Sequence, residues 1–435
     1  MKKLDSIPTG KIERVSKLVT TGVKIGGNYL KYYGHKMVNP DLTKDTLHED
    51  NATDIYDGLK ELKGSALKVA QMLSMEKNLL PQSYVDKFSL SQFSVPPLSA
   101  PLVIKTFKKY FGVEPYVLFD DFNADSVNAA SIGQVHRATK GGKDLAVKIQ
   151  YPGVRDSIST DIAIVKPIAL RMFNLKGTSD EYFQEVEDKL TEETDYTLEL
   201  QQSEAVRVQC APLKNLRFPK YYPELSCEKI ITMDWMEGIH LSEWCKQDHS
   251  QADRNKVGQA LYDFYMYQIH VLHKFHADPH PGNFLVDEEA NLIAIDFGCM
   301  KALPQDFYTP YFELIQPETL DSDVLFTEKL ITLQVLKPDD TKEEFEYFKA
   351  LFHELLNVFV EPYRHERFDF SQDGFNNAIA GLSERFANDK NIRKMNTNRG
   401  SRHFIYVNRT FFGLFSLLFD LKATVDIYGF KKYLS

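Results

Sequence analysis

LAVKI (residues 145–149), HADPHPGNF (276–284) and IAIDFGC (293–299) are the three stretches that decide the fold of this chain. The first places Lys148 inside an apolar run that is typical of a buried strand. In the second, Asp278 precedes Asn283 by five residues, and in the third Asp296 closes another apolar run. Taken alone, each is also explained by a loop cap or by an ordinary turn after a buried strand.

The order and spacing of these stretches are typical of the phosphate- and metal-binding motifs of protein-kinase-like folds. We predict that Lys148 contacts the phosphates of ATP or ADP, and that Asn283 and Asp296 hold Mg²⁺. Asp278 is then the catalytic base or the carboxylate that orients the substrate. The predicted fold class is α+β, a two-lobed protein-kinase-like fold.

Composition excludes several classes of protein. The chain has 435 residues, 43% of them hydrophobic and 26% charged, as in ordinary soluble proteins. A net charge of −9 argues against a nucleic-acid partner. The four cysteines form no CxxC pair, which favours reduced thiols. No run reaches the roughly 20 apolar residues of a membrane span, and we interpret 411–419 as a buried helix rather than an apolar surface.

The first 36 residues are basic, with eight Lys and Arg against two acidic residues, a net +6. Apolar residues recur in this segment at helical spacing, which predicts a basic amphipathic helix. Such a helix either lies on an anionic membrane surface or docks on the rest of the protein with a solvated basic face. Both interpretations agree with the pattern.

Residues from Asn51 to about Gly112 read as helical, with Asn51 or Thr53 as the first cap and a last helix at 101–111. Lys68 and Gln71 are three residues apart on the first of these helices and project from one face. By themselves they are explained by a solvated helix surface.

The next segment predicts strands around a nucleotide-binding loop, followed by a hairpin at 141–142 and a third strand at 144–150. Alanine and serine stand where a kinase has glycines, so the backbone cannot wrap phosphates as a glycine loop does, which predicts altered nucleotide preference or slow phosphoryl transfer. Further along, 229–238 reads as a buried strand running into a hinge that holds adenine. After it, 257–275 predicts a long amphipathic helix that delivers Asp278 and His276, which orients the loop from behind. The predicted ATP-binding residues are Ala129, Ala130, Ser131, Ile132, Gly133, Gln134, Val135, Lys148, Met233 and Trp235.

These residues carry a resemblance to the UbiB/ADCK family of atypical kinases, which is tied to ubiquinone biosynthesis. The matching stretches are LKVAQ (67–71), AASIGQVH (129–136), VKIQYPGV (147–154), EETDY (192–196), FHADPHPGN (275–283) and DFG (296–298). The resemblance implies that the helix with Lys68 and Gln71 packs over the active site, facing Glu193 and Asp195 as a regulatory pair. This chain has Ala70 where the family's Lys-x-Gly-Gln motif has glycine.

The same resemblance implies that Glu199 is the catalytic partner of Lys148, with Glu192 and Glu185 as alternatives. The predicted domains are a basic segment at 1–48, a helical extension at 49–115, an N-lobe at 116–236 and a C-lobe at 237–435. No Ala-Pro-Glu tripeptide follows the third stretch, which argues against a peptide-docking platform.

Two functional hypotheses follow from these residues. One is an ATPase or small-molecule kinase that binds Mg²⁺ and ATP and supports isoprenoid-quinone biosynthesis, with a lipophilic quinone precursor or biosynthetic proteins as partners. The other is a pseudokinase scaffold that binds nucleotide, with a protein kinase as a less favoured third reading. The expected location is cytoplasmic, at the inner face of a membrane, without a transmembrane helix.

Overall fold

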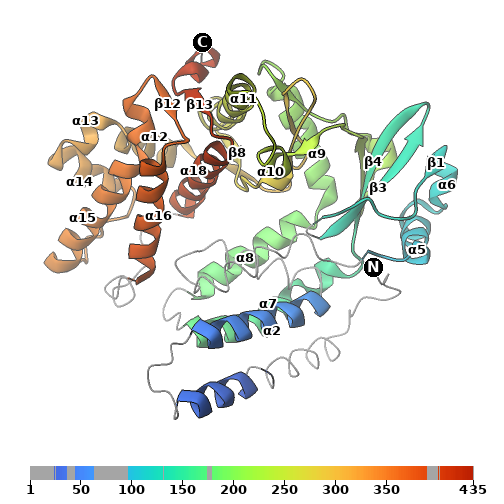
Figure 1. The fold of residues 1–435 in the computed structure, drawn as a ribbon, viewed down its shortest axis with the longest axis horizontal. Helices are drawn as coiled ribbons and strands as arrows, with labels where there is room; N and C mark the ends of the chain where they lie inside the picture. The colour runs from blue at the N-terminus through green and yellow to red at the C-terminus, as the bar shows by residue number, and fades with distance from the viewer. Residues whose placement is uncertain are drawn as a thin grey trace. The chain divides into compact units, whose positions relative to one another are not determined.

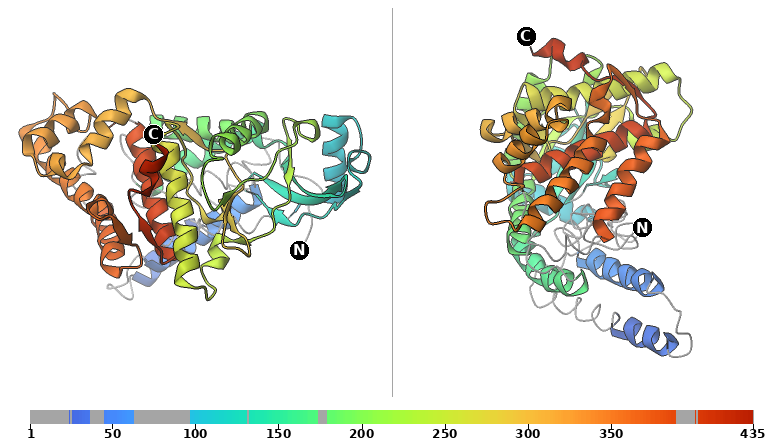
Figure 2. Two further views of the ribbon diagram at one scale, coloured as in Figure 1. Left: turned by 90° about the horizontal axis from the view of Figure 1, so that it is seen from above. Right: turned by 90° about the vertical axis from the view of Figure 1, so that its left-hand side faces the viewer.

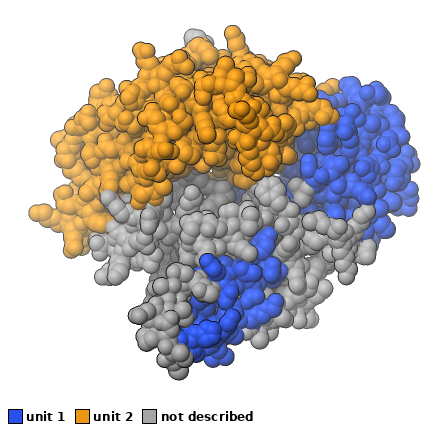
Figure 3. Space-filling model, viewed as in Figure 1, with its two compact units in different colours: residues 1–200, 221–235 blue, residues 201–220, 236–435 orange. Residues whose placement is uncertain are grey.

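The computed structural model describes residues 24, 26–36, 45–62, 97–130, 132–173, 179–388, 400 and 402–434. The predictions for Lys68, Ala70, Gln71 and Ser131 therefore lie outside the described residues. The chain divides into two compact units, shown in different colours in Figure 3. Unit 1 comprises residues 1–200 and 221–235, and unit 2 comprises residues 201–220 and 236–435.

Unit 1 is built on a five-stranded antiparallel sheet (Figure 1). Its main path runs β1-β3-β4-β6, and β2 pairs with β3. The predicted hairpin is present, since Gly141 and Gly142 join β3 to β4 with φ of +59° and +74°. In the register of the sheet, Lys148 of β4 stands between Val135 and Ile231. The strands are β1 (Asp121–Phe122), β2 (Asn128–Ala129), β3 (Gly133–Lys140), β4 (Lys143–Gln150) and β6 (Ile230–Asp234).

Helices accompany this sheet in unit 1, and α7 packs beside α8 in every view (Figures 1 and 2). The predicted end of the helix before the strands is confirmed, because α5 stops at Gly112 with φ +76°. The elements are α2 (Asp45–Leu62), α5 (Ala100–Phe111), α6 (Pro115–Leu118), α7 (Val154–Phe173), α8 (Ser179–Glu193), α9 (Tyr196–Gln209) and the 3₁₀ turn η2 (Pro223–Leu225). Helix α9 begins in unit 1 and ends in unit 2.

The predicted start of α2 was wrong. The helix begins at Asp45, so Asn51 and Thr53 lie inside it, and the side chain of Asn51 is fully buried. Asn51 instead accepts a hydrogen bond from Asn28, which also donates to Asp54 at 2.7 Å. From sequence alone, an asparagine that hydrogen-bonds to another helix cannot be told from an asparagine that caps the start of a helix.

The described residues of unit 2 form three small sheets. The largest has the order β5-β10-β9-β7, and β11 pairs with β8 and β12 with β13. The strands are β5 (Leu216–Arg217), β7 (Ile239–His240), β8 (Lys274–His276), β9 (Phe284–Val286), β10 (Leu292–Ala294), β11 (Met300–Ala302), β12 (Arg367–Asp369) and β13 (Thr424–Asp426). Short 3₁₀ turns are η3 (Pro281–Asn283), η4 (Glu361–Arg364) and η5 (Gly429–Tyr433).

The helices of unit 2 surround one large hydrophobic core, and α15 lies beside α16 (Figures 1 and 2). The helices are α10 (Leu241–Trp244), α11 (Gln251–His270), α12 (Gln305–Leu314), α13 (Pro317–Leu320), α14 (Asp323–Thr332), α15 (Lys342–Phe359), α16 (Asp373–Asn388) and α18 (Arg402–Asp420). Helix α18 buries Phe411, Leu414 and Phe415, so 411–419 is core. Among the described helices, none is long and apolar enough to cross a membrane.

The prediction of one amphipathic helix over 257–275 was wrong at both ends. Helix α11 begins at Gln251, where the Ser250 side chain accepts a hydrogen bond from the backbone N–H of Asp253. It ends at His270, and Phe275 belongs to β8 instead. From Ala260 to Ile269 every residue is buried, so this half of the helix lacks the polar face by which a sequence marks where a helix ends.

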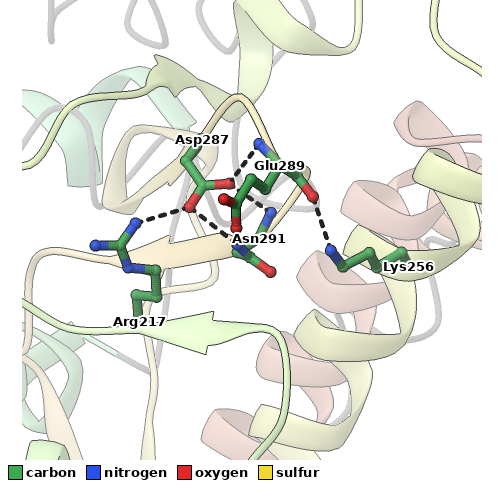
Figure 4. Close-up of polar contacts among 5 residues, drawn as sticks. All are labelled: Arg217, Lys256, Asp287, Glu289 and Asn291. Atoms are coloured by element: carbon green, nitrogen blue, oxygen red, sulfur yellow. Dashed lines mark hydrogen bonds and ion pairs between the residues drawn. The ribbon is translucent and has the colours of Figure 1, made fainter.

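The turn between β9 and β10 is fixed by Asp287 (Figure 4). Its carboxylate accepts hydrogen bonds from Arg217 at 2.9 Å and from the backbone and side chain of Asn291 at 2.8 and 3.1 Å. Burial acts to raise the pKa of Asp287, but these donors outweigh burial and leave the pKa lowered. Lys256 of α11 donates to the carbonyl of Glu289 at 2.7 Å. The hairpin is therefore tied to a neighbouring strand and to a helix.

Candidate functional site

In unit 1 the predicted lysine and glutamate form a buried ion pair. Nζ of Lys148 on β4 lies 2.7 Å from Oε1 of Glu199 on α9, and their side chains are only 10% and 5% exposed. Asp195 accepts a hydrogen bond from the N–H of Leu198 at 3.1 Å, so it caps the first turn of the helix that carries Glu199. The pairing is present, and the catalytic role of these two residues stays a prediction.

Tyr196 is a site residue that sequence reasoning missed. Its ring lies 5.2 Å from the ammonium of Lys148, and the side chain is fully buried. The available signal was its spacing, because residues three apart on a helix share a face and Tyr196 precedes Glu199 by three. One turn of α9 therefore presents both an aromatic ring and a carboxylate to the same lysine.

Gly133 allows the loop before β3 to pack closely. An ideal Cβ at Gly133 would overlap the carbonyl oxygen of Ile149 and lie 2.9 Å from the hydroxyl of Tyr196. Its φ lies outside the left-handed region, so close approach rather than backbone freedom requires glycine here. The loop closes with a 2.9 Å hydrogen bond from the N–H of Ala130 to the carbonyl of Gly133.

A buried chain of polar groups holds β3 behind this loop. The side-chain oxygen of Gln134 accepts from the backbone N–H of Leu98 at 2.8 Å, and its side-chain nitrogen lies 2.7 Å from Nε2 of His136. Nδ1 of His136 lies 2.8 Å from the carbonyl of Asn123, which assigns the proton to that nitrogen. Burial lowers the pKa of His136 to about 4, against a raising effect of the Asn123 hydrogen bond. The Gln134 side chain is thus engaged in structure.

The predicted hinge follows β6. Met233 is buried and paired with Ala146 of β4, and the N–H of Trp235 donates to the carbonyl of Asp144 at 3.0 Å. The guanidinium of Arg137 lies 4.8 Å from the centre of the Trp235 ring. The strand and the turn stand where the sequence predicts them, and adenine binding by them stays a prediction.

In unit 2 the backbone brings the other predicted residues together. Strands β9 and β10 pair from Phe284 opposite Ala294, and the N–H of Ile295 continues the ladder to the carbonyl of Asn283 at 3.0 Å. Asn283 and Asp296 therefore leave the same end of one hairpin. Likewise β8 and β11 pair at His276 and Met300.

The loop that carries Asp278 is joined to the same end. The N–H of Ala277 donates to the carbonyl of Cys299 at 2.8 Å, so Asp278 comes directly after a rung shared with the Asp296 turn. The Asn283 amide donates to the carbonyl of Asp278 at 2.9 Å. Main-chain pairing thus gathers Asp278, Asn283 and Asp296 into one site.

The donors of this site suit Mg²⁺. Carboxylate and amide oxygens are hard ligands, and Mg²⁺ in nucleotide sites takes one or two of them together with phosphate oxygens and water. Oδ1 of Asp296 accepts from the N–H of Gly298 at 3.0 Å, which fixes the carboxylate, and the Asn283 amide nitrogen is turned toward Asp278, which orients its oxygen away. Among the described side chains no group of three or more His, Cys, Asp and Glu forms a metal cage.

Two histidines flank Asp278, and hydrogen bonds tie both of them into the surrounding structure. His276 is buried on β8, and its backbone N–H donates to the side-chain oxygen of Gln268 on α11 at 3.0 Å. Nδ1 of His280 accepts from the N–H of Gly282 at 2.9 Å and so shapes the turn before Asn283. That the His276 side chain orients the loop stays a prediction.

The structure describes only two of the four residues predicted to have a regulatory role. Glu193 ends α8 and Asp195 precedes α9, whereas Lys68 and Gln71 lie outside the described residues. The pairing of the two motifs stays a prediction.

Comparison with known proteins agrees with this geometry. The family model of the ABC1 atypical kinase-like domain matches residues 90–325. The chain is 31% identical over 258 residues to Protein ACTIVITY OF BC1 COMPLEX KINASE 8, chloroplastic, of Arabidopsis thaliana, covering 57% of this chain and 34% of the relative. It is 28% identical over 316 residues to AarF domain-containing protein kinase 1 of Xenopus tropicalis, covering 70% and 60%. The match thus spans between a third and three fifths of these relatives.

A solved structure of Rv3197 with erythromycin, from Mycobacterium tuberculosis, has the same fold. The TM-score is 0.61 at 24% identity, and the match covers 89% of this chain and 96% of the other. Together with the family match, this confirms the predicted kinase-like fold of mixed helix and sheet.

Proposed function

The chain belongs to the ABC1 atypical kinase-like family, and we propose from this premise that it is an ATPase or small-molecule kinase dependent on Mg²⁺ and ATP. We further propose that it supports isoprenoid-quinone biosynthesis at a membrane surface, as the resemblance to the UbiB/ADCK family implies. Its partner would be a lipophilic quinone precursor or a biosynthetic protein.

The observation that carries the proposal is the Lys148–Glu199 pair. Burying two charges costs several kcal/mol per ion, and their attraction offsets this only in part, so such a pair is poor evidence of selection for stability. The pair has the 2.7 Å geometry that a kinase uses to hold a lysine toward nucleotide phosphates. A site that had lost nucleotide chemistry would have no need to keep two charges buried in this core.

The second support comes from the oxygen ligands of unit 2. A scaffold needs nucleotide binding alone, for which Lys148 and the loop suffice. Asp278 and the metal-binding Asn283 and Asp296 are needed together only for phosphoryl transfer. Their common placement through main-chain hydrogen bonds favours turnover over the scaffold alternative.

A protein substrate is disfavoured by the chain after the Asp296 turn. Strand β11 ends at Ala302 and helix α12 begins at Gln305, so two residues separate them. A protein kinase has an activation segment at this place that forms the peptide-docking platform. A small molecule or water therefore fits this site better as phosphate acceptor.

The membrane part of the proposal rests on residues 26–36, which are helical. Leu30 is 78% exposed and Tyr33 is 54% exposed, and Lys31 and Lys36 stand beside them. An exposed apolar face flanked by lysines suits the surface of an anionic membrane. This is the pattern that the basic N-terminal segment predicts.

The first test is ATP hydrolysis by the purified protein with Mg²⁺. We expect Asp296→Asn to lower kcat by about a hundredfold or more, because an amide oxygen is a far weaker metal ligand than a carboxylate. Asp248→Asn is the matched control, since Asp248 is an exposed aspartate of unit 2 outside the predicted site residues, and it should retain full activity. ATP binding without turnover in the parent protein would instead favour the scaffold.

The membrane proposal has its own test. Liposomes containing anionic lipid should raise the turnover and carry the protein in a flotation assay. Leu30→Ser combined with Tyr33→Ser should abolish flotation without changing the basal turnover. Val117→Ser is the control, because Val117 is an equally exposed apolar residue of unit 1, at 70% exposure. Unchanged flotation of the double variant would contradict this part of the proposal.

A further inference from the structure

Helix α18 carries a glycine where it meets the catalytic loop. An ideal Cβ at Gly413 would overlap the Cγ of Pro279, lie 3.1 Å from its Cβ and lie 3.4 Å from its carbonyl oxygen. Pro279 is buried and follows Asp278 directly. The backbone of α18 and the ring of Pro279 are therefore packed at a distance that a side chain of any size would prevent.

Glycine is a poor helix former, so its place inside α18 asks for a reason. A second helix of unit 2 supplies the comparison, because Gly381 lies inside α16 and a Cβ there would meet nothing within 4 Å. Gly381 costs the helix stability without a packing gain. Gly413 has the same cost, but it also permits the approach to Pro279.

The same face of α18 also contacts β11, the strand that follows the Asp296 turn. Tyr406 precedes Gly413 by seven residues, which is two helical turns. The Lys301 ammonium lies 5.5 Å from the centre of the Tyr406 ring. Lys301 is on β11, which pairs with β8 and follows the Asp296 turn. One helix face thus touches both segments that bring Asp278 and Asp296 together.

We propose that α18 positions the catalytic loop and that Gly413 is a positioning residue for Asp278. The helix lies at residues 402–420, beyond the 90–325 that the family model matches. The catalytic loop of this chain is therefore set in part by a segment outside the common domain. The expected fall in kcat rests on the proposed function. The expected displacement of the Asp278 loop rests on packing alone.

The test compares two glycine-to-alanine changes in helices of one unit. Gly413→Ala should push the Asp278 loop away from α18 and lower kcat about tenfold to a hundredfold, since a displacement near 1 Å at a reacting group has an effect of that size. The dissociation constant of ATP should stay within about twofold, because Lys148 and the loop before β3 are unchanged. Gly381→Ala should leave both quantities unchanged.

A rescue variant separates this contact from general damage to the fold. Pro279→Ala removes the Cγ that the new methyl group would overlap, so the double variant Gly413→Ala/Pro279→Ala should recover part of the kcat that Gly413→Ala loses. If Gly413→Ala does not fold, recovery of folded protein in the double variant supports the contact. A double variant no better than Gly413→Ala contradicts it.

A second measurement does not depend on turnover. Backbone amides of the loop are hydrogen-bonded at Ala277, His280, Gly282 and Asn283, so their hydrogen exchange can be followed. Gly413→Ala should speed this exchange about tenfold or more while Gly381→Ala does not. Equal exchange and equal kcat in the two variants would overturn the inference. Absence of turnover in the parent protein, with faster exchange in Gly413→Ala, would count against the proposed enzyme alone.

Discussion

The two units of this protein hold their site residues in different ways. In unit 1, two side chains from distant elements meet in the core, where Lys148 and Glu199 form a 2.7 Å ion pair at 10% and 5% exposure. In unit 2, the backbone assembles the site, because hydrogen bonds at the ends of paired strands bring the segments of Asp278, Asn283 and Asp296 together. Their side chains are half-buried.

This difference separates chemistry from stability. One partner of a buried ion pair cannot be replaced alone without affecting folding, whereas a side chain that is placed by its backbone can be changed while the fold persists. The chain allows each unit to be followed by itself, because its two tryptophans are Trp235 in unit 1 and Trp244 in unit 2. Fluorescence in a Trp244→Phe background reports unit 1, and fluorescence in a Trp235→Phe background reports unit 2.

The largest effect is expected from breaking the buried pair. Glu199→Leu leaves the Lys148 ammonium without its carboxylate in the core, and the free energy of unfolding of unit 1 should fall by about 3–5 kcal/mol. Denaturant unfolding followed at Trp235 measures this loss. The double variant Lys148→Met/Glu199→Leu should recover all of that stability and remain without ATP turnover.

This double variant decides what the pair is for. Recovered stability without activity means that the charges serve nucleotide chemistry. A double variant as unstable as Glu199→Leu would show that the pair holds the sheet and α9 together, and the comparison of the two units would lose its basis.

A smaller loss is expected from Gly133→Ala. The new methyl group would overlap the backbone carbonyl of Ile149, which cannot move without shifting β4, so we expect a loss near 3 kcal/mol in unit 1, at the upper end for overpacking. Unfolding at Trp235 measures it. Gly34→Ala is the control, since a Cβ at Gly34 meets nothing within 4 Å. Equal stability of the two variants would show that the loop moves freely.

Local signals explain what the sequence predicts well. The hairpin at Gly141 and Gly142 and the end of α5 at Gly112 are set by glycines with positive φ, which a single sequence displays. The partnership of Lys148 with Glu199 came from the motif resemblance, since no local rule links residues 51 apart. Strand β6 was predicted from its mostly apolar run. In the structure all but the last of its residues are buried.

Tertiary packing explains what the sequence could not show. Helix α11 is buried on all sides from Ala260 to Ile269, so this half carries no polar face to mark where the helix ends, and 257–275 merged a helix with a strand. Asn51 is of a residue type that often caps a helix, but its side chain accepts a hydrogen bond from Asn28 instead. Gly413 matters through its contact with Pro279, which is a property of the fold and leaves no pattern in the chain. The spacing of Tyr196 from Glu199 is visible in the chain, but it gains meaning only from the contact of Tyr196 with Lys148.

The pH dependence of unit 1 should come from His136. Its folded-state pKa of about 4 lies below the ordinary 6.5, so the unfolded chain takes up a proton first as pH falls. The stability that neutral His136 gives is complete above pH 6.5 and is lost as pH drops toward 4. Between about pH 7.5 and pH 5 the loss should be about 2 kcal/mol, measured at Trp235.

The control for this pH dependence is His136→Asn. This variant should be less stable at neutral pH, and its stability should change little between pH 6.5 and 5. An unchanged slope would assign it to other groups of unit 1. His270 of unit 2 also has a pKa lowered to about 4 by burial, so the Trp244 signal should shift in the same range, independently of His136.

The smallest effect on folding is expected where the effect on chemistry is largest. In Asp296→Asn the side-chain oxygen can still accept the hydrogen bond from the N–H of Gly298, and the turn is set by strand pairing. Stability of unit 2, followed at Trp244, should therefore change by less than about 0.5 kcal/mol, while Mg²⁺-dependent turnover is lost. A large loss of stability would mean that the carboxylate, and not the backbone, holds this end of the hairpin, which would make the two units alike.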